Sequence, residues 1–256
     1  MTLDQAMRKV NTRHGEWELH RRDIWGGSVS SQGSVASAAS GAGRKNNGPF
    51  KESLITYYDR QAGYHPKEVD KDGEPLALLR CMVLDKPLIT PKVCASHLWS
   101  HSRADDLPLL GLASTETENP RNGLLLAKSI EVAFDKKEAC FLYNPFDQKF
   151  YFCVLNPSLL PIRIYNPDPK IQDDYDYPDT FASLNNKPLQ LPKGVFPYKR
   201  ILGFHARCTF KSARSKWITE ERYQEFLVQE RVAWKFSVDA PWYSEGAVDP
   251  LDTFEK

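Results

Sequence analysis

The chain has 256 residues, enough for one large domain or for one domain with extensions. Its 34 Lys and Arg nearly balance 33 Asp and Glu, which argues against a uniformly basic nucleic-acid coat protein and against an acidic disordered tail. Hydrophobic residues make up 41% of the chain, so a sizeable core is expected. We see no 18-residue apolar run and no apolar signal region, so we expect no membrane partner and an intracellular location, nucleus or cytoplasm.

Composition divides the chain into four parts. Residues 1–25 form an N-terminal arm that we expect to be flexible, and residues 26–49 form a linker rich in Ser, Gly and Ala. Such a linker cannot bury enough apolar surface to order itself. Residues 50–235 carry the apolar segments of a folded body, and residues 236–256 form a C-terminal tail. We find no internal repeat, so the body is predicted to be one domain.

The first half of the body predicts short strands and one short helix. Apolar runs of strand length indicate buried strands. The predicted elements are Leu54–His65 as strand or helix, Leu76–Leu84, Lys92–Trp99 and Asn122–Ala127 as strands, and Lys128–Glu138 as a helix. A long polar connection over Ser100–Arg121 separates the last two strands.

The second half of the body predicts a hairpin followed by helices. The aromatic-rich runs ACFLY and QKFYFCVL flank an Asn-Pro-Phe-Asp segment at 144–147, which is typical of a β-hairpin. Residues 156–192 are crowded with Pro and Asp. Phe196–Lys216 predicts one helix, and the segment that begins at Thr219 predicts another with Glu in its first turn, as the helix dipole favours. The fold class is therefore predicted to be α+β.

Two segments carry a distinctive order of motifs. VCASHLW (Val93–Trp99) places a His at a strand end, and NPRNGLLLAKSIEVAFDKKEACFLYN (Asn119–Asn144) contains Asn-Gly and then Phe-Asp. This order resembles the HNH endonuclease family, whose active site is a ββα-metal finger. The resemblance covers residues 81 to about 151 and implies such a finger within the larger domain, followed by the hairpin and closed by C-terminal helices. Glu131 stands where the family usually has its third His.

The motif residues suit phosphodiester hydrolysis. A single imidazole can deprotonate water near neutral pH, and His97 is the candidate general base. The resemblance implies that Asn122 holds this His in position. Glu131 and Asp135 would project from one helix face and could bind a divalent cation, with Ser96 adding its hydroxyl or carbonyl oxygen. These oxygen ligands favour Mg²⁺ or Mn²⁺ over Zn²⁺. The alternative is ordinary: a structural His, an Asn-Gly turn and a solvated helix face.

A basic segment suggests how substrate could be bound. Residues 193–216 hold seven basic residues and no acidic one. On a helix, four of them would lie within about 60° of one another. These four are Arg200, Arg207, Lys211 and Arg214. They could follow phosphates without reading bases, so we expect a nucleic-acid partner, DNA rather than RNA. The alternative is a solvated face that complements the acidic loop at 173–179.

These observations lead to two functional hypotheses of different classes. The first is a metal-dependent endonuclease that hydrolyses phosphodiester bonds in DNA with little sequence specificity. The second is a catalytically inactive HNH-like module that binds nucleic acid or protein, which Glu131 and Ser96 at ligand positions motivate. A third possibility, a toxin or effector nuclease, has no supporting feature in the N-terminal residues.

Overall fold

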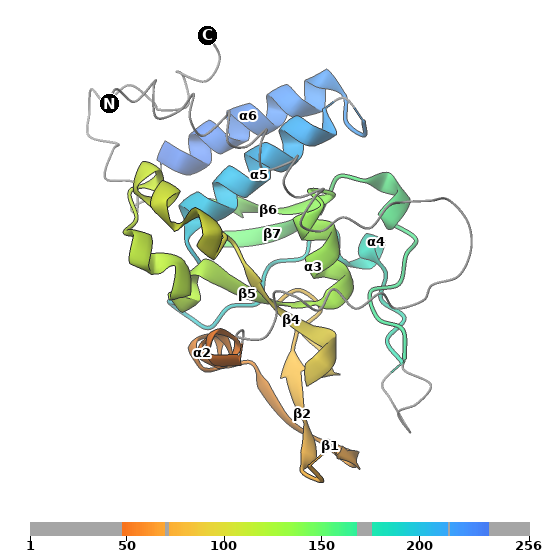
Figure 1. Cartoon of the computed structure of the whole chain (residues 1–256). Coiled ribbons are helices and arrows are strands. Elements are labelled where there is room, and N and C mark those ends of the chain that lie inside the picture. The colour runs from red at the N-terminus through yellow and green to blue at the C-terminus, as the bar shows by residue number, and fades with distance from the viewer. Residues whose placement is uncertain (1–47, 70–71, 168–175, 215, 236–256) are drawn as a thin grey trace, which may run out of the picture.

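The structure, a computed structural model, describes residues 48–69, 72–167, 176–214 and 216–235. The predicted arm, the C-terminal tail, residues 26–47 of the predicted linker, and Asp173 and Asp174 of the acidic loop lie outside these described residues. Helices and small antiparallel sheets alternate along the chain, so the α+β prediction is confirmed (Figure 1). No helix in the described ranges is long and apolar enough to cross a bilayer.

The N-terminal part of the body is one helix followed by a three-stranded sheet. Its elements are α2 (Gly48–Tyr58), β1 (Gln61–Val69), β2 (Pro75–Arg80) and β3 (Pro87–Ile89), with strand order β1-β2-β3. The segment predicted as strand or helix at 54–65 contains both, because the helix ends at Tyr58 and a strand begins at Gln61. The strand predicted over 76–84 ends early at Arg80, and Cys81–Leu84 form a buried turn.

The middle of the chain forms a ββα unit. Its elements are η1 (Thr90–Lys92), β4 (Val93–His97), η2 (His101–Leu110), η3 (Ser114–Glu118), η4 (Pro120–Asn122), β5 (Gly123–Ala127) and α3 (Lys128–Asp135). The two strands are antiparallel, and their register pairs His97 with Gly123 at one end and Val93 with Ala127 at the other. The predicted strands and helix are therefore confirmed, and three segments of 3₁₀-helix occupy the long polar connection.

A tight hairpin and the C-terminal helices complete the body. The remaining elements are β6 (Ala139–Asn144), β7 (Lys149–Val154), η5 (Pro157–Leu159), α4 (Phe181–Leu184), α5 (Lys199–Ala213) and α6 (Glu220–Lys235). The predicted hairpin and both predicted helices are present, and α5 and α6 lie side by side above β6 and β7 in Figure 1.

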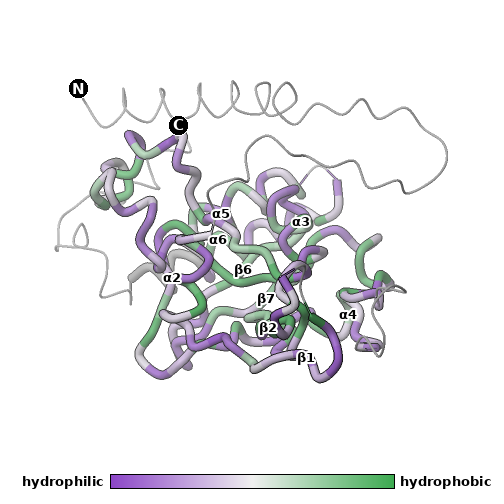
Figure 2. Tube along the Cα trace, turned by 60° about the horizontal axis from the view of Figure 1, so that its bottom comes forward, coloured by the Kyte–Doolittle hydropathy of each residue, from purple (hydrophilic) through white to green (hydrophobic). Residues whose placement is uncertain are grey.

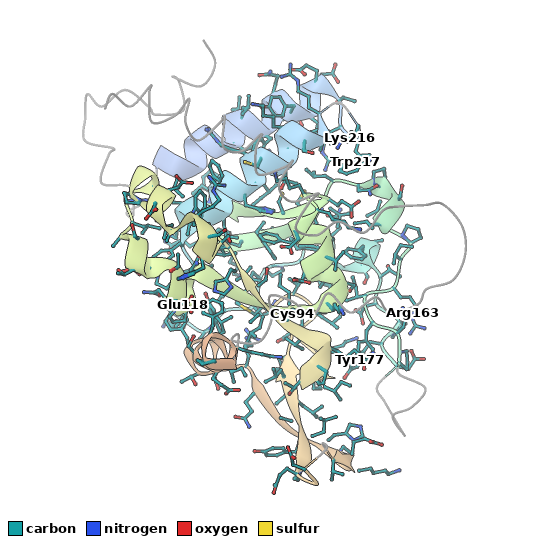
Figure 3. The ribbon with its side chains drawn as sticks, viewed as in Figure 1. Cys94, Glu118, Arg163, Tyr177, Lys216 and Trp217 are labelled. Atoms are coloured by element: carbon teal, nitrogen blue, oxygen red, sulfur yellow. The ribbon has the colours of Figure 1, made fainter. Side chains whose placement is uncertain are left out.

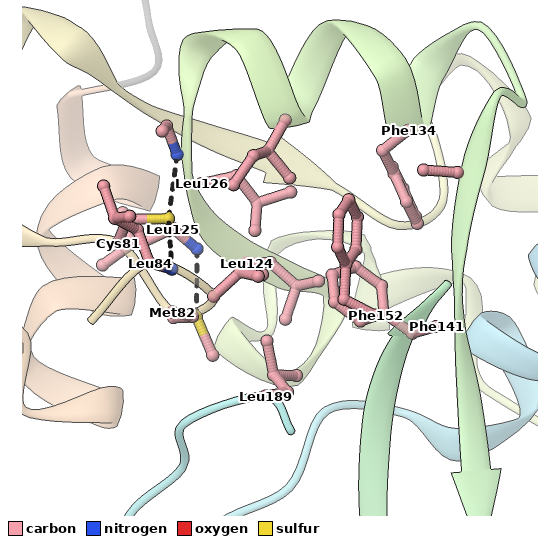
Figure 4. Close-up of a cluster of buried hydrophobic side chains, with 14 of the residues drawn as sticks. Cys81, Met82, Leu84, Leu124, Leu125, Leu126, Phe134, Phe141, Phe152 and Leu189 are labelled. Carbon is pink, nitrogen blue, oxygen red and sulfur yellow. Dashed lines mark hydrogen bonds between the residues drawn. The ribbon is translucent and has the colours of Figure 1, made fainter. Parts of the chain in front are cut away.

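Strand β5 lies in the hydrophobic core, and every one of its residues is buried. Hydrophobic residues concentrate on the central strands, and hydrophilic ones on the outer loops (Figure 2). Sulfur atoms complete the hydrogen bonding of β5 on the side away from β4: Leu125 N–H donates to Met82 Sδ (3.1 Å), and Ala127 N–H donates to Cys81 Sγ (3.2 Å), as Figure 4 shows. The Cys81–Leu84 turn thus holds the point at which β5 leads into α3.

Candidate active site

His97 occupies the last position of β4, where α2 covers it. The ring of Phe50 stacks on the imidazole, with ring centroids 3.7 Å apart and an interplanar angle of 9°. The His97 side chain is 20% exposed, and its Nε2 atom is buried without a hydrogen-bond partner. This nitrogen lies 3.9 Å from Oε1 of Glu118, a residue of η3 that Figure 3 shows near α2. Several other described side chains also have a buried polar atom without a hydrogen-bond partner, so this feature alone does not distinguish His97.

The surroundings of His97 keep its imidazole in the neutral form. Burial is the largest influence and lowers the pKa of His97 below its ordinary value, because the charged form loses hydration. The Glu118 carboxylate raises this pKa, and the neighbouring His101 lowers it. The net effect is a lowered pKa, so the ring is neutral at physiological pH and can accept a proton.

Asn122 joins the two strands of the site behind His97. Its side chain is fully buried: Oδ1 accepts from Trp99 N–H (3.0 Å), and Nδ2 donates to the carbonyl oxygens of Trp99 (2.9 Å) and Thr117 (2.8 Å). Its carbonyl oxygen accepts from Leu98 N–H (2.8 Å). Asn122 therefore fixes the backbone on the C-terminal side of His97 and acts on the imidazole through the main chain.

Gly123 permits the close approach of α2 to the site. Its backbone is extended, at φ −147° and ψ 164°, so the Asn-Gly pair is not the turn that such a dipeptide usually forms. A Cβ atom at this position would lie 2.6 Å from Phe50 Cζ and 2.9 Å from Leu54 Cδ2. Because only glycine leaves this space, Phe50 can lie flat on His97.

Two residues of this site, Phe50 and Glu118, were not predicted from the sequence. Neither belongs to a motif, and Phe50 reaches His97 only because α2 packs on the β4–β5 pair. Nothing in the local pattern around residue 50 links it to residue 97. By contrast, His97 and Asn122 were predicted, and the structure brings them together through the backbone at Leu98 and Trp99.

The predicted metal ligands are divided between two elements. Ser96 is buried on β4, and since successive strand residues point to opposite faces, it lies on the other face from His97. Glu131 and Asp135 are half-buried on α3, one turn apart, and both interact with other groups. No group of three or more His, Cys, Asp or Glu side chains in the described parts of the chain could hold a metal ion.

The kind and number of these donors bear on which cation they could bind. A Zn²⁺ site takes three or four protein ligands, which these residues do not supply together. Mg²⁺ needs only one or two carboxylates, because it keeps several waters and binds substrate phosphate directly. Glu131 and Asp135 are two hard oxygen donors one turn apart on α3, and donors of this type suit a hydrated divalent cation.

Arg200 does not lie on the exposed basic stripe that was predicted for this helix. It is 6% exposed, and its Nη1 donates to the carbonyl oxygen of Leu110 (2.8 Å). Helical periodicity correctly placed it on one side of α5, but η2 covers that side at the N-terminal end of the helix. Its guanidinium therefore holds η2 against α5.

The other three predicted residues lie in the second half of α5 and at its end. Arg207 is half-buried, whereas Lys211 and Arg214 are exposed. Arg214 makes an ion pair with Glu220 at the start of α6 and lies over the ring of Tyr223. Lys211 and Arg214 are thus the exposed cations of the predicted set, and Arg214 is partly neutralised by Glu220.

The comparison with known families points to the same part of the chain. Residues 81–141 match the family model described as HNH endonuclease. The resemblance inferred from the sequence is confirmed over this segment, which includes β4, β5 and α3. Searches of curated proteins and of solved structures gave no match. An HNH segment indicates a nuclease or a nucleic-acid-binding protein, and nucleases of this family generally use a divalent metal.

Proposed function

We propose that this chain is a metal-dependent endonuclease that hydrolyses phosphodiester bonds in DNA with little sequence specificity. The observation that carries the proposal is the position of His97, a half-buried histidine at the strand end of an HNH-type ββα unit, next to the buried Asn122. An intracellular location, in the nucleus or the cytoplasm, would give it access to such a substrate.

His97 acts as the general base in this proposal. Its neutral ring takes a proton from the attacking water, and the hydroxide formed attacks phosphorus. The bond from phosphorus to the leaving sugar oxygen breaks, and that oxygen takes a proton from solvent. Asn122 holds the main chain at Trp99 and so keeps the imidazole at a constant distance from the scissile phosphate. Arg207, Lys211 and Arg214 would contact neighbouring phosphates, which gives affinity without base readout.

A divalent cation is part of the proposal. Bound Mg²⁺ or Mn²⁺ would neutralise charge on the scissile phosphate and on the leaving oxygen. Glu131 and Asp135 would hold it through their carboxylates. Ser96 is a weaker candidate ligand, because its side chain is buried on the face of β4 opposite His97.

Plasmid nicking tests the assignment. Purified protein is incubated with supercoiled plasmid and Mg²⁺ or Mn²⁺, and His97→Ala is compared with wild type and with His65→Ala, a control histidine on β1 outside the ββα unit. General-base loss should lower the nicking rate by about 10²–10⁴-fold, and chelation with EDTA should stop it. Circular dichroism confirms that each variant is folded. Equal nicking by wild type and His97→Ala would remove His97 from the mechanism.

The alternative is a catalytically inactive module that binds nucleic acid or protein. Glu131 in place of the usual His, and Ser96 in the position before His97, motivate it. It predicts a gel shift of DNA in EDTA with no nicking under any divalent metal. For a module that neutralises Z phosphates, the logarithm of the binding constant should fall with a slope of about −0.9Z against the logarithm of salt concentration.

A further inference from the structure

The turn between β6 and β7 presents an aromatic ring to solvent. Phe146 is 88% exposed in this turn, which spans residues 145–148. Asn144 Oδ1 accepts a hydrogen bond from Phe146 N–H (3.0 Å), which fixes the backbone at this position. Single exposed apolar side chains are common on protein surfaces, so Phe146 suggests a contact with another molecule only together with the groups around the turn.

Cationic and aromatic groups surround the base of this turn. Nζ of Lys199 lies 4.6 Å from the ring centroid of Tyr143 and donates to its hydroxyl (3.1 Å), and it lies 5.2 Å from the ring of Phe196. Lys149, the first residue of β7, is exposed beside the turn. The carboxylate of Asp147, the acidic residue of the turn, accepts a hydrogen bond from the Tyr151 hydroxyl.

Contacts between a cation and aromatic residues are also found closer to the candidate active site. Arg121 Nε donates to the carbonyl oxygen of Phe196 (3.2 Å), and its guanidinium carbon lies 4.5 Å from the ring centroid of Tyr198. Arg121 directly precedes Asn122. A series of cation–aromatic contacts between half-buried side chains therefore runs from Tyr143, near the end of β6, to Arg121, which precedes Asn122.

We propose that this aromatic surface, formed by Phe146, Tyr143, Phe196, Lys199 and Arg121, binds single-stranded nucleic acid. The inference rests on the proposed nuclease function and defines its substrate class. Aromatic side chains stack on unpaired bases of any sequence, while cations between them attract the backbone. Paired bases hide their faces within the duplex, so an exposed ring such as Phe146 favours an unpaired strand. Stacking of this kind also agrees with low sequence specificity.

Fluorescence anisotropy tests the aromatic surface. A labelled 20-nucleotide oligothymidine and a 20-base-pair duplex are titrated with wild type, Phe146→Ala and the control Val228→Ala. Val228, on α6, is 62% exposed, so both variants remove an exposed apolar side chain without touching the core. Loss of one stacked base should weaken single-strand binding by about 5- to 150-fold. The affinity of Phe146→Ala for the duplex should stay within twofold of wild type. The affinity of Val228→Ala for the single strand should do the same.

Three results would overturn the inference. The first is that Phe146→Ala binds the single strand as tightly as wild type does. The second is that this variant loses affinity equally for single strand and duplex. The third is that wild type does not bind the single strand. If Phe146 instead joins two copies of the chain, its removal changes the sedimentation coefficient and leaves single-strand affinity intact.

The binding assay is kept independent of catalysis. Titrations are done in EDTA, where no nicking is expected, whereas the dependence of nicking on His97 is measured separately with metal. Nicking that needs His97 together with unchanged binding by Phe146→Ala would reject the aromatic surface alone. Binding that needs Phe146, with no metal-dependent cleavage of either the plasmid or a single-stranded circular DNA, would reject the nuclease and keep the surface.

Discussion

Two antiparallel strand pairs of this molecule, β4–β5 and β6–β7, reach similar geometry by different means. Residues 145–148 connect β6 to β7, and the side chains of Asn144 and Asp147 accept backbone N–H groups within that turn. Residues 98–122 connect β4 to β5, and no local turn joins these strands. Their register depends on Asn122, on the buried β5 residues and on the cover supplied by α2.

This difference explains where the candidate site lies. A short turn fixes strand pairing locally and leaves little room for other functions, whereas a long connection costs more loop entropy and needs tertiary contacts to hold it. The same long connection carries Glu118 and Arg121 next to His97 and Asn122. The β4–β5 pair should therefore be sensitive to single substitutions, and the β6–β7 pair should tolerate them.

Asn122→Ala should have the largest effect on stability. It leaves the buried Trp99 N–H and two carbonyl groups without partners, and each such group costs ~1–3 kcal/mol, so we expect a loss of at least about 3 kcal/mol in the free energy of unfolding. Urea denaturation measures this loss. A change below about 1 kcal/mol would mean that the β4–β5 register does not depend on Asn122.

Gly123→Ala should come next. The added Cβ would overlap Phe50 and Leu54, and overpacking of a core costs ~1–3 kcal/mol. Gly48→Ala is the matched control, because no atom lies within 4 Å of its added Cβ. Thermal unfolding of both variants would show a lower midpoint for Gly123→Ala alone. Equal midpoints would contradict the close approach of α2 to β5.

Asn144→Ala should have a smaller effect, since it removes one exposed hydrogen bond from the β6–β7 turn. Intramolecular hydrogen bonds contribute ~0.5–1.5 kcal/mol to stability. The same urea experiment gives the comparison with Asn122→Ala directly. A loss as large as that of Asn122→Ala would refute the contrast between the two strand pairs.

Glu118→Gln should produce the smallest change, and it should appear in the pH profile. His97 must be neutral to accept a proton, so nicking should fall as the pH drops through its lowered pKa. Glu118 raises the pKa of His97, and its loss should move the acid limb to lower pH. Exposed ion pairs are worth ~0.2–1 kcal/mol, so the shift should be about 0.1–0.7 pH units. A shift to higher pH would contradict the sign of the Glu118 effect.

The candidate site was only partly predictable from the sequence. The residue order from His97 through Asn122 to Asp135 predicted the strands, the helix and the family resemblance, because motif order and apolar runs are local properties. The same local reasoning misplaced Arg200, since helical periodicity gives the side of a helix but not what covers it. It also suggested a turn at Asn-Gly, where the structure has an extended strand and a steric need for glycine.

The sequence by itself determined the α+β class, the β6–β7 hairpin and the HNH-type segment, since these depend on residues close together in the chain. Only the tertiary structure decided what surrounds His97. Phe50 comes from a helix that lies far away in sequence, and Glu118 comes from a 3₁₀ turn in the long connection. Burial by Phe50 and the charge of Glu118 together set the protonation of the imidazole, and both depend on long-range packing that no local pattern records.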